Sequence, residues 1–122
     1  EMPGGKILPL LPTEIMPKKG AFFDYESKYS NGGAEEITPA RIPKSVLART
    51  QEIAVSAHKI LGCRGYSRTD MIWDKEHDKL NVLEINTLPG LTQTSLLPQQ
   101  ALACGIRFSE LLDIIVDASW KK

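Results

Sequence analysis

The sequence predicts an α+β fold in a single domain, and two patterns support this prediction. Apolar residues recur at spacings of three and four over residues 44–61, which indicates an amphipathic helix. Two shorter runs, CRGYSRTDMIWD (63–74) and KLNVLEIN (79–86), lie on either side of a highly polar turn, as in an antiparallel β-hairpin. With 122 residues, 42% of them apolar and 25% charged, the chain has the size and composition of one globular domain.

The N-terminal third is the least regular part of the sequence. Residues 1–20 contain four prolines and three glycines, and we expect one short strand at about 7–16, interrupted by Pro9 and Pro12. Residues 21–43 follow neither the helical nor the strand period. A loop of this length is uncommon in a compact domain and is often functional.

The central helix has clear boundaries. Pro43 suits its first turn, and Gly62 is the expected stop. The apolar stripe that defines the helix consists of Val46, Leu47, Thr50, Ile53, Ala54, Ala57, Ile60 and Leu61.

Two further helices are expected after a loop at 87–97. The first, PQQALACG, begins at Pro98 and ends at Gly105. The second, FSELLDIIVDASW, has Ser109 as its predicted cap. Its apolar stripe is formed by Leu111, Leu112, Ile115 and Val116.

The overall charge excludes several classes of partner. Fifteen basic and fifteen acidic side chains cancel, which argues against a nucleic-acid binder or a protein of anionic membrane surfaces. No apolar run approaches the roughly 20 residues that span a bilayer, and no signal peptide is visible.

Cys63 and Cys104 are far apart and lack metal-binding spacing, so we expect free thiols in a cytoplasmic protein.

The hairpin gathers polar side chains on one face. A turn centred on His77 places Asp70 opposite Glu84, Arg68 opposite Asn86 and Ile72 opposite Val82. Directly opposed carboxylates destabilise a sheet unless something offsets their repulsion. Two carboxylates and an amide suit Mg²⁺, and Arg68 offers a fork of donors for a phosphate or carboxylate. The alternative is a hairpin whose polar face meets only water, with Arg68 paired to either carboxylate.

The segment NTLPGLTQTS follows these residues directly. Glycine permits close approach of the backbone to a ligand, and the N–H of Gly90 could face a developing oxyanion. Ser95 lies just before a predicted helix N-terminus, which favours anions. The alternative is an ordinary Pro-Gly turn with capping hydroxyls.

Three stretches together resemble a known enzyme family. SRTDMIWD and LNVLEINTLPGLTQTSLLPQQALACGI resemble the last third of D-alanine–D-alanine ligases, members of the ATP-grasp superfamily, and FFDYESKY resembles their mobile loop. The resemblance is collinear over about residues 7–115. It implies that residues 1–122 are the C-terminal portion of an ATP-grasp domain, with a mainly antiparallel sheet packed with helices and a mobile loop at about 21–43.

The resemblance also implies an activity. In such ligases ATP phosphorylates the carboxylate of one D-alanine, and the amine of a second D-alanine attacks the acyl phosphate to give the dipeptide used in peptidoglycan synthesis. Asp70, Glu84 and Asn86 would bind two Mg²⁺ ions (Mn²⁺ is possible), with Glu84 bridging them. Arg68 would stabilise the transferred phosphoryl group and the tetrahedral intermediate, and the Gly90 N–H would complete that oxyanion site.

The remaining implied roles concern the substrates. Ser95 and the backbone of Leu96 would hold the carboxylate of the second D-alanine. Lys28 would touch nucleotide phosphate and Tyr29 would close the loop over the acceptor. Phe22 and Leu83 would line the adenine pocket. His58, His77 and the two cysteines receive no role.

These family enzymes are much longer than this chain, so we expect a fragment that is inactive alone and a homodimer at full length. Two alternatives stay open. One is an ATP-grasp ligase with D-lactate or D-serine as acceptor, although the Lys28-Tyr29 pair favours D-alanine. The other is a binding module of ATP-grasp origin that has lost catalysis.

Overall fold

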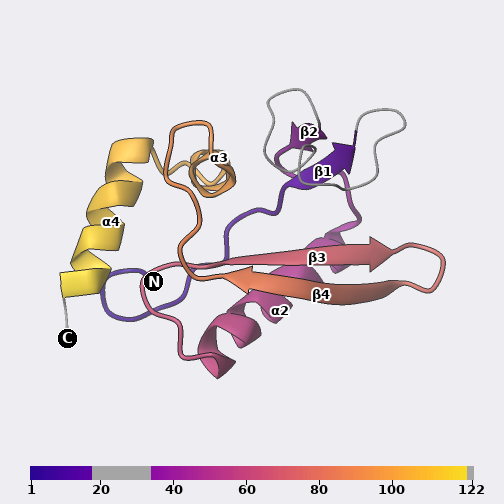
Figure 1. Ribbon diagram of the computed structural model, residues 1–122, viewed down its shortest axis with the longest axis horizontal. Helices are drawn as coiled ribbons and strands as arrows, with labels where there is room; N and C mark the ends of the chain where they lie inside the picture. Colours follow the sequence, from indigo (N-terminus) through magenta and orange to yellow (C-terminus); the bar gives the residue numbers. More distant parts are fainter. Residues whose placement is uncertain (18–33, 121–122) are drawn as a thin grey trace.

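The computed structural model describes residues 1–17 and 34–120. Its described part contains two antiparallel two-stranded sheets and three helices, which confirms the predicted α+β class. Figure 1 shows the longer hairpin running across the molecule, with one helix crossing it and two helices at one end. The elements are β1 (Glu14–Pro17), β2 (Ala34–Ile37), α2 (Lys44–Ile60), β3 (Arg68–Asp74), β4 (Lys79–Asn86), α3 (Leu96–Ala103) and α4 (Phe108–Trp120).

The small sheet corrects two expectations about the N-terminal third. The strand predicted at about 7–16 is confined to β1, because prolines at positions 9 and 12 cannot donate to a ladder. Its partner β2 lies inside the segment 21–43 that was predicted as a loop. The four residues of β2, AEEI, are too few and too polar to show an alternating pattern.

Helix α2 has the boundaries that the sequence predicted, within one residue. It ends in a Schellman arrangement, in which Cys63 N donates to His58 O at 2.9 Å and Gly62 N to Lys59 O at 3.0 Å. Gly62 adopts a φ of 63°, which explains why glycine stands there. The apolar stripe is only partly buried, since the Ile60 side chain at its end is 82% exposed.

Strands β3 and β4 form the predicted hairpin with one irregularity. Arg68 pairs with Asn86 and Asp70 with Glu84, as predicted. The register then shifts, and Ile72 pairs with Asn81, so the predicted pairing of Ile72 with Val82 is wrong. An extra residue in β4 at this point forms a β-bulge, which alternation alone does not reveal.

Helix α2 covers the face of the hairpin that lies opposite Arg68 and Asp70. Contacts from α2 reach Ser67, whose Oγ bonds His58 Nδ1 at 2.7 Å, and Asp78, which also bonds Trp73 Nε1. Ser67, directly before β3, and Trp73 within it occupy odd positions, and successive side chains of a strand point to opposite faces. Arg68 and Asp70 therefore lie on the face turned away from α2.

The largest cluster of buried apolar residues lies between α3 and α4. Leu97, Ala101 and Leu111 form its centre. Five partly buried side chains pack against it, namely Leu10, Tyr66, Leu91, Ile106 and Ile115. Because Leu91 belongs to the loop before α3, this cluster also anchors that loop.

The two C-terminal helices differ from prediction at their starts. Helix α3 begins at Leu96, ahead of Pro98, because proline is tolerated within a first turn. Its last residue is Ala103, and the predicted stop, Gly105, follows the C-cap Cys104 with a φ of 82°. Helix α4 begins at Phe108, so Ser109 is not its cap. The side chain of Glu110 instead accepts a hydrogen bond from Arg107 N at 2.9 Å.

No helix in the described ranges is long and apolar enough to cross a membrane.

Candidate functional site

The centre of the candidate site is an ion pair within β3. Arg68 Nε donates to Asp70 Oδ1 at 2.7 Å and Nη2 donates to Oδ2 at 3.1 Å. The two side chains are 18% and 23% exposed. This forked contact holds the carboxylate and the guanidinium in fixed positions. Of the two carboxylates that sequence reasoning offered to Arg68, the structure pairs it with Asp70.

The β4 side of the site comes from Glu84 and Asn86. Glu84 is the strand partner of Asp70, so both carboxylates lie on the face turned away from α2. Asn86 Oδ1 accepts a hydrogen bond from Leu88 N at 3.0 Å, which turns the chain out of the strand. A carbonyl oxygen has two lone pairs, so this contact leaves Asn86 one further acceptor position.

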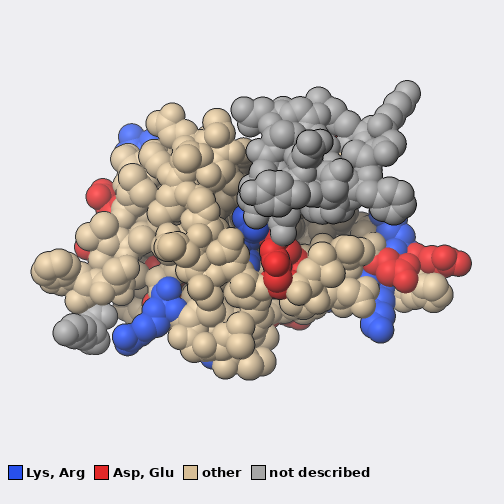
Figure 2. All heavy atoms as spheres, in the orientation of Figure 1, with Lys and Arg blue, Asp and Glu red and all other residues tan. Residues whose placement is uncertain are grey.

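The set of donor atoms fits a hard divalent cation. No group of three or more His, Cys, Asp and Glu side chains that could hold a metal occurs among the residues described. Asp70, Glu84 and Asn86 instead supply two carboxylates and an amide, and Mg²⁺ is usually held by one or two carboxylates together with substrate phosphates. Figure 2 shows acidic and basic atoms meeting at the middle of this face of the molecule.

The β-bulge places an apolar side chain beside these polar groups. The register shift between Asp70 and Met71 leaves Leu83 as the extra residue of β4. Its side chain is 60% exposed. Bulges often redirect side chains next to functional sites, so an exposed leucine here has a structural cause.

The loop between β4 and α3 packs closely around Gly90. A Cβ atom added at Gly90 would lie 2.9 Å from Ser95 Oγ, closer than real side chains come. Pro89 is buried. A side chain at position 90 would therefore have to displace the Ser95 hydroxyl.

Ser95 lies just before a helix N-terminus, as the sequence predicted, and because α3 begins at Leu96 rather than at Pro98, Ser95 is its N-cap residue. Its Oγ makes no capping bond and instead contacts Thr92, at 3.1 Å from Thr92 N and 2.6 Å from Thr92 Oγ1. Leu96 is the first residue of the helix. The sequence shows Thr92 as one of the hydroxyl donors of this loop, but its contact with Ser95 was not predicted.

The far end of the hairpin is fixed to α2. Arg49 donates from Nη1 to both carboxylate oxygens of Asp78, at 2.9 and 3.0 Å, and from Nη2 to its carbonyl oxygen at 2.9 Å. Hydrogen bonds from Arg49 and Trp73 lower the pKa of the Asp78 carboxyl. Asp70, Glu84 and Asn86 therefore lie on a hairpin whose turn is bound to α2.

Three predicted site residues, Phe22, Lys28 and Tyr29, lie outside the described residues. The strand that follows them is nevertheless linked to the site loop. Gln99 Nε2, on α3, contacts Glu36 Oε2 of β2 at 3.2 Å and Thr94 O at 2.5 Å.

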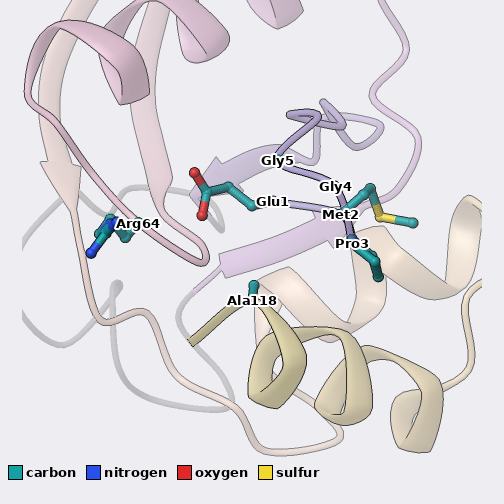
Figure 3. Close-up of a pocket in the computed structure, with 7 residues that line it drawn as sticks. All are labelled: Glu1, Met2, Pro3, Gly4, Gly5, Arg64 and Ala118. Carbon is teal, nitrogen blue, oxygen red and sulfur yellow. The ribbon is translucent and has the colours of Figure 1, made fainter. Parts of the chain in front are cut away.

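A separate pocket lies near the start of the chain. Figure 3 shows it beside the C-terminal part of α4, and its volume is about 170 Å³. None of the predicted site residues lines it. The residues that do are Glu1, Met2, Pro3, Gly4, Gly5, Arg64 and Ala118.

Comparisons with known proteins point to one family. Residues 5–117 match the family described as D-ala D-ala ligase C-terminus. A D-alanine–D-alanine ligase from Leptospira interrogans is 50% identical over 117 residues, which cover 96% of this chain and 32% of that protein. A D-alanine–D-alanine ligase from Erythrobacter litoralis is 47% identical over 95% of this chain and 36% of its own length.

Solved structures agree with these matches. A D-alanine–D-alanine ligase from Bacillus anthracis complexed with ATP is 37% identical with a TM-score of 0.72, covering 90% of this chain and 35% of that one. The VanG D-Ala:D-Ser ligase from Enterococcus faecalis is 35% identical with a TM-score of 0.78, covering 94% and 33%. The chain spans about a third of the length of the relatives it matches.

Proposed function

The chain belongs to the D-alanine–D-alanine ligase family, and from this membership we propose that it supplies the cation-binding and acceptor-binding part of an ATP-dependent ligase. The enzyme joins two D-alanine molecules through an acyl phosphate for peptidoglycan synthesis. The observation that carries the proposal is the pairing of Asp70 with Glu84 and of Arg68 with Asn86 on one face of the hairpin.

The hairpin face holds magnesium in this proposal. Asp70, Glu84 and Asn86 would hold two Mg²⁺ ions, or Mn²⁺, through two carboxylates and an amide oxygen. When bound, the ions neutralise phosphate charge, which is the main requirement of phosphoryl transfer. The partly buried position of Asp70, fixed by Arg68, supports a carboxylate that is ready to bind without rearrangement.

Arg68 and Gly90 act on the reacting groups. The guanidinium of Arg68 contacts the transferred phosphoryl group and the tetrahedral intermediate, where negative charge develops. The forked ion pair with Asp70 fixes the guanidinium of Arg68 at this position, which supports its role. The Gly90 N–H is a second donor to the same oxyanion, and the small size of Gly90, which leaves room for the Ser95 hydroxyl, supports this position.

The substrates contact the remaining residues. Ser95 Oγ and the Leu96 N–H bind the carboxylate of the acceptor D-alanine at the start of α3. Leu83 packs against adenine together with Phe22, Lys28 contacts nucleotide phosphate, and Tyr29 covers the acceptor. The exposed position of Leu83 on the bulge supports its contact with a planar base.

The proposal extends to the setting of the enzyme. ATP and D-alanine are its small-molecule partners, and we propose a cytoplasmic homodimer that uses neither nucleic acid nor membrane. An enzyme with D-serine as acceptor is the second candidate, because the Enterococcus faecalis D-Ala:D-Ser ligase is 35% identical to this chain.

Acceptor choice is tested by phosphate release from ATP in the full-length ligase that contains this chain. D-Alanine, D-serine and D-lactate are each supplied with D-alanine as the first substrate. The proposal expects the highest kcat/KM with D-alanine. A preference for D-serine or D-lactate would support the acceptor-switched alternatives, and no release with any acceptor would support a non-catalytic module.

A further inference from the structure

Ser95 does not use its side chain as an N-cap serine ordinarily does. Such a serine usually accepts a hydrogen bond from the backbone N–H two or three residues further along. The third residue of α3 is Pro98, which has no N–H, and the side chain of Ser95 makes no capping bond. The hydroxyl of Ser95 is therefore free of the helix and faces the loop that precedes it.

Within that loop the hydroxyl has one close neighbour, Thr92. The Thr92 N–H donates to Ser95 Oγ at 3.1 Å, and the two hydroxyl oxygens are 2.6 Å apart. The Ser95 N–H in turn donates to Thr92 O at 3.0 Å. Gly90 leaves room for this arrangement, because a Cβ atom there would lie 2.9 Å from Ser95 Oγ.

The number of hydrogen bonds limits what the Ser95 hydroxyl can still do. A hydroxyl accepts two hydrogen bonds and donates one. The Thr92 N–H fills one acceptor position. If the Thr92 hydroxyl fills the second, the proton of Ser95 remains to be donated to a ligand. In the opposite direction Ser95 donates its proton to Thr92. Its oxygen then presents only lone pairs to the ligand, and a carboxylate is repelled by them. An anionic ligand therefore selects the first direction.

We propose that Thr92 is a positioning residue that holds Ser95 as a hydrogen-bond donor toward the carboxylate of the acceptor amino acid. This inference rests on the proposed function, since it specifies how the acceptor site is prepared. Because Thr92 already fixes the position of the Ser95 oxygen, only the direction of the two hydroxyl protons has to be set when the acceptor binds.

Two anchors keep the loop in place for this role. Gln99 Nε2 donates to Thr94 O at 2.5 Å, and Leu91 packs against the cluster between α3 and α4. Thr94 Oγ1 is 3.5 Å from Thr92 Oγ1, at the limit of a hydrogen bond, so Thr94 contributes little to the position of Ser95.

The test compares two substitutions in the full-length ligase that contains this chain. Thr92→Val removes the hydroxyl and keeps the branched shape, whereas Thr92→Ser keeps the hydroxyl. Initial rates over a wide range of D-alanine give separate KM values for the first and second D-alanine. We expect Thr92→Val to raise the second KM about three- to tenfold, with the KM for ATP and kcat changed less than about twofold. Thr92→Ser should keep the KM for the second D-alanine at the value of the unmodified enzyme.

Thr94→Val is the matched control and should leave both KM values unchanged. An unchanged second KM in Thr92→Val would overturn the inference. So would a parallel rise in the KM for ATP, or a Thr92→Ser variant as impaired as Thr92→Val, since each indicates a merely structural role. Should Thr92→Val lower the melting temperature, Thr92→Ala replaces it. Inactivity of the unmodified enzyme would instead count against the proposed function.

Discussion

Gly90 is the residue whose replacement the structure restricts most directly. Its neighbour Ser95 Oγ lies 2.9 Å from the position of an added Cβ atom, so Gly90→Ala displaces the Ser95 hydroxyl. We predict a loss of roughly 10- to 100-fold in kcat/KM, because small displacements at a positioned site have effects of this size. The measurement is D-alanine-dependent phosphate release by the full-length ligase.

Two further variants separate this clash from other effects. Gln93→Ala changes an exposed side chain of the same loop and should keep full activity. Ser95→Ala removes the oxygen that clashes, so adding Gly90→Ala to it should lower the melting temperature less than Gly90→Ala does alone. Equal losses in both backgrounds would show that the clash is not the cause.

His58 makes stability depend on pH. Burial lowers the pKa of its imidazole below the ordinary 6.5, and its Nε2 has no hydrogen-bond partner among the described atoms. Below pH 6.5 the unfolded chain takes up a proton that the folded chain resists. The contribution of neutral His58 to the free energy of unfolding is therefore fully present above about pH 6.5. It is lost as the pH falls through the lowered pKa of the folded state.

The prediction is that the melting temperature of the 122-residue chain falls between pH 7 and pH 5, and that His58→Gln flattens this dependence. His77→Gln changes the other histidine, which is exposed in the hairpin turn, and serves as the control. Equal slopes in His58→Gln and in the unmodified chain would contradict the assignment to His58.

The hairpin is the element on which sequence reasoning succeeded most, and its one error is informative. The pairs nearest the open end, Asp70 with Glu84 and Arg68 with Asn86, were predicted correctly from a turn centred on His77. The pairing of Ile72 could not be predicted, because it depends on the extra residue in β4. That residue, Leu83, follows the equally apolar Val82. Two adjacent apolar residues do not show which of them is extra.

Other elements escaped prediction for different physical reasons. Strand β2 is short and polar, so its identity depends on its partner β1 and not on its own pattern. The contact of Thr92 with Ser95 depends on the path of a loop, which no period encodes. Conversely, Gly62 and Gly105 were predictable helix ends, because a positive φ there selects glycine.

The contact between Asp78 in the hairpin turn and Arg49 of α2 can be tested by replacing Asp78 in two ways. Asp78 has a φ of 47° and binds Arg49 through its carboxylate. Asp78→Asn removes the charge but tolerates this backbone, whereas Asp78→Ala also introduces strain. We predict melting temperatures in the order unmodified, Asp78→Asn, Asp78→Ala. Equal values for the two variants would contradict the backbone argument.

At the scale of the whole molecule, much apolar surface of the described part is open. Apart from prolines and glycines, only Val46, Leu97, Ala101 and Leu111 are buried apolar residues there, while Leu88 is 77% exposed. The matched relatives are about three times as long as this chain. Exposed apolar surface of this kind ordinarily marks contacts with other parts of a protein.

The isolated 122-residue chain is therefore predicted to be inactive. Phosphate release from ATP, with saturating D-alanine and Mg²⁺, should not exceed the rate of a protein-free control. Activity should appear when the same chain forms part of the full-length ligase. D-Alanyl-D-alanine formation by the isolated chain would contradict the division of the site between this part and the rest of the enzyme.

The most direct test concerns the proposed magnesium site on the hairpin face that carries Asp70, Glu84 and Asn86. In the full-length ligase, phosphate release is measured as a function of Mg²⁺ concentration for Glu84→Gln and Asn86→Ala, with Glu76→Gln in the exposed turn of the same hairpin as control. If this face holds the metal, both site variants raise the Mg²⁺ requirement by roughly 10- to 100-fold while the control does not. An unchanged Mg²⁺ requirement in folded Glu84→Gln and Asn86→Ala enzymes would show that this face does not hold the metal.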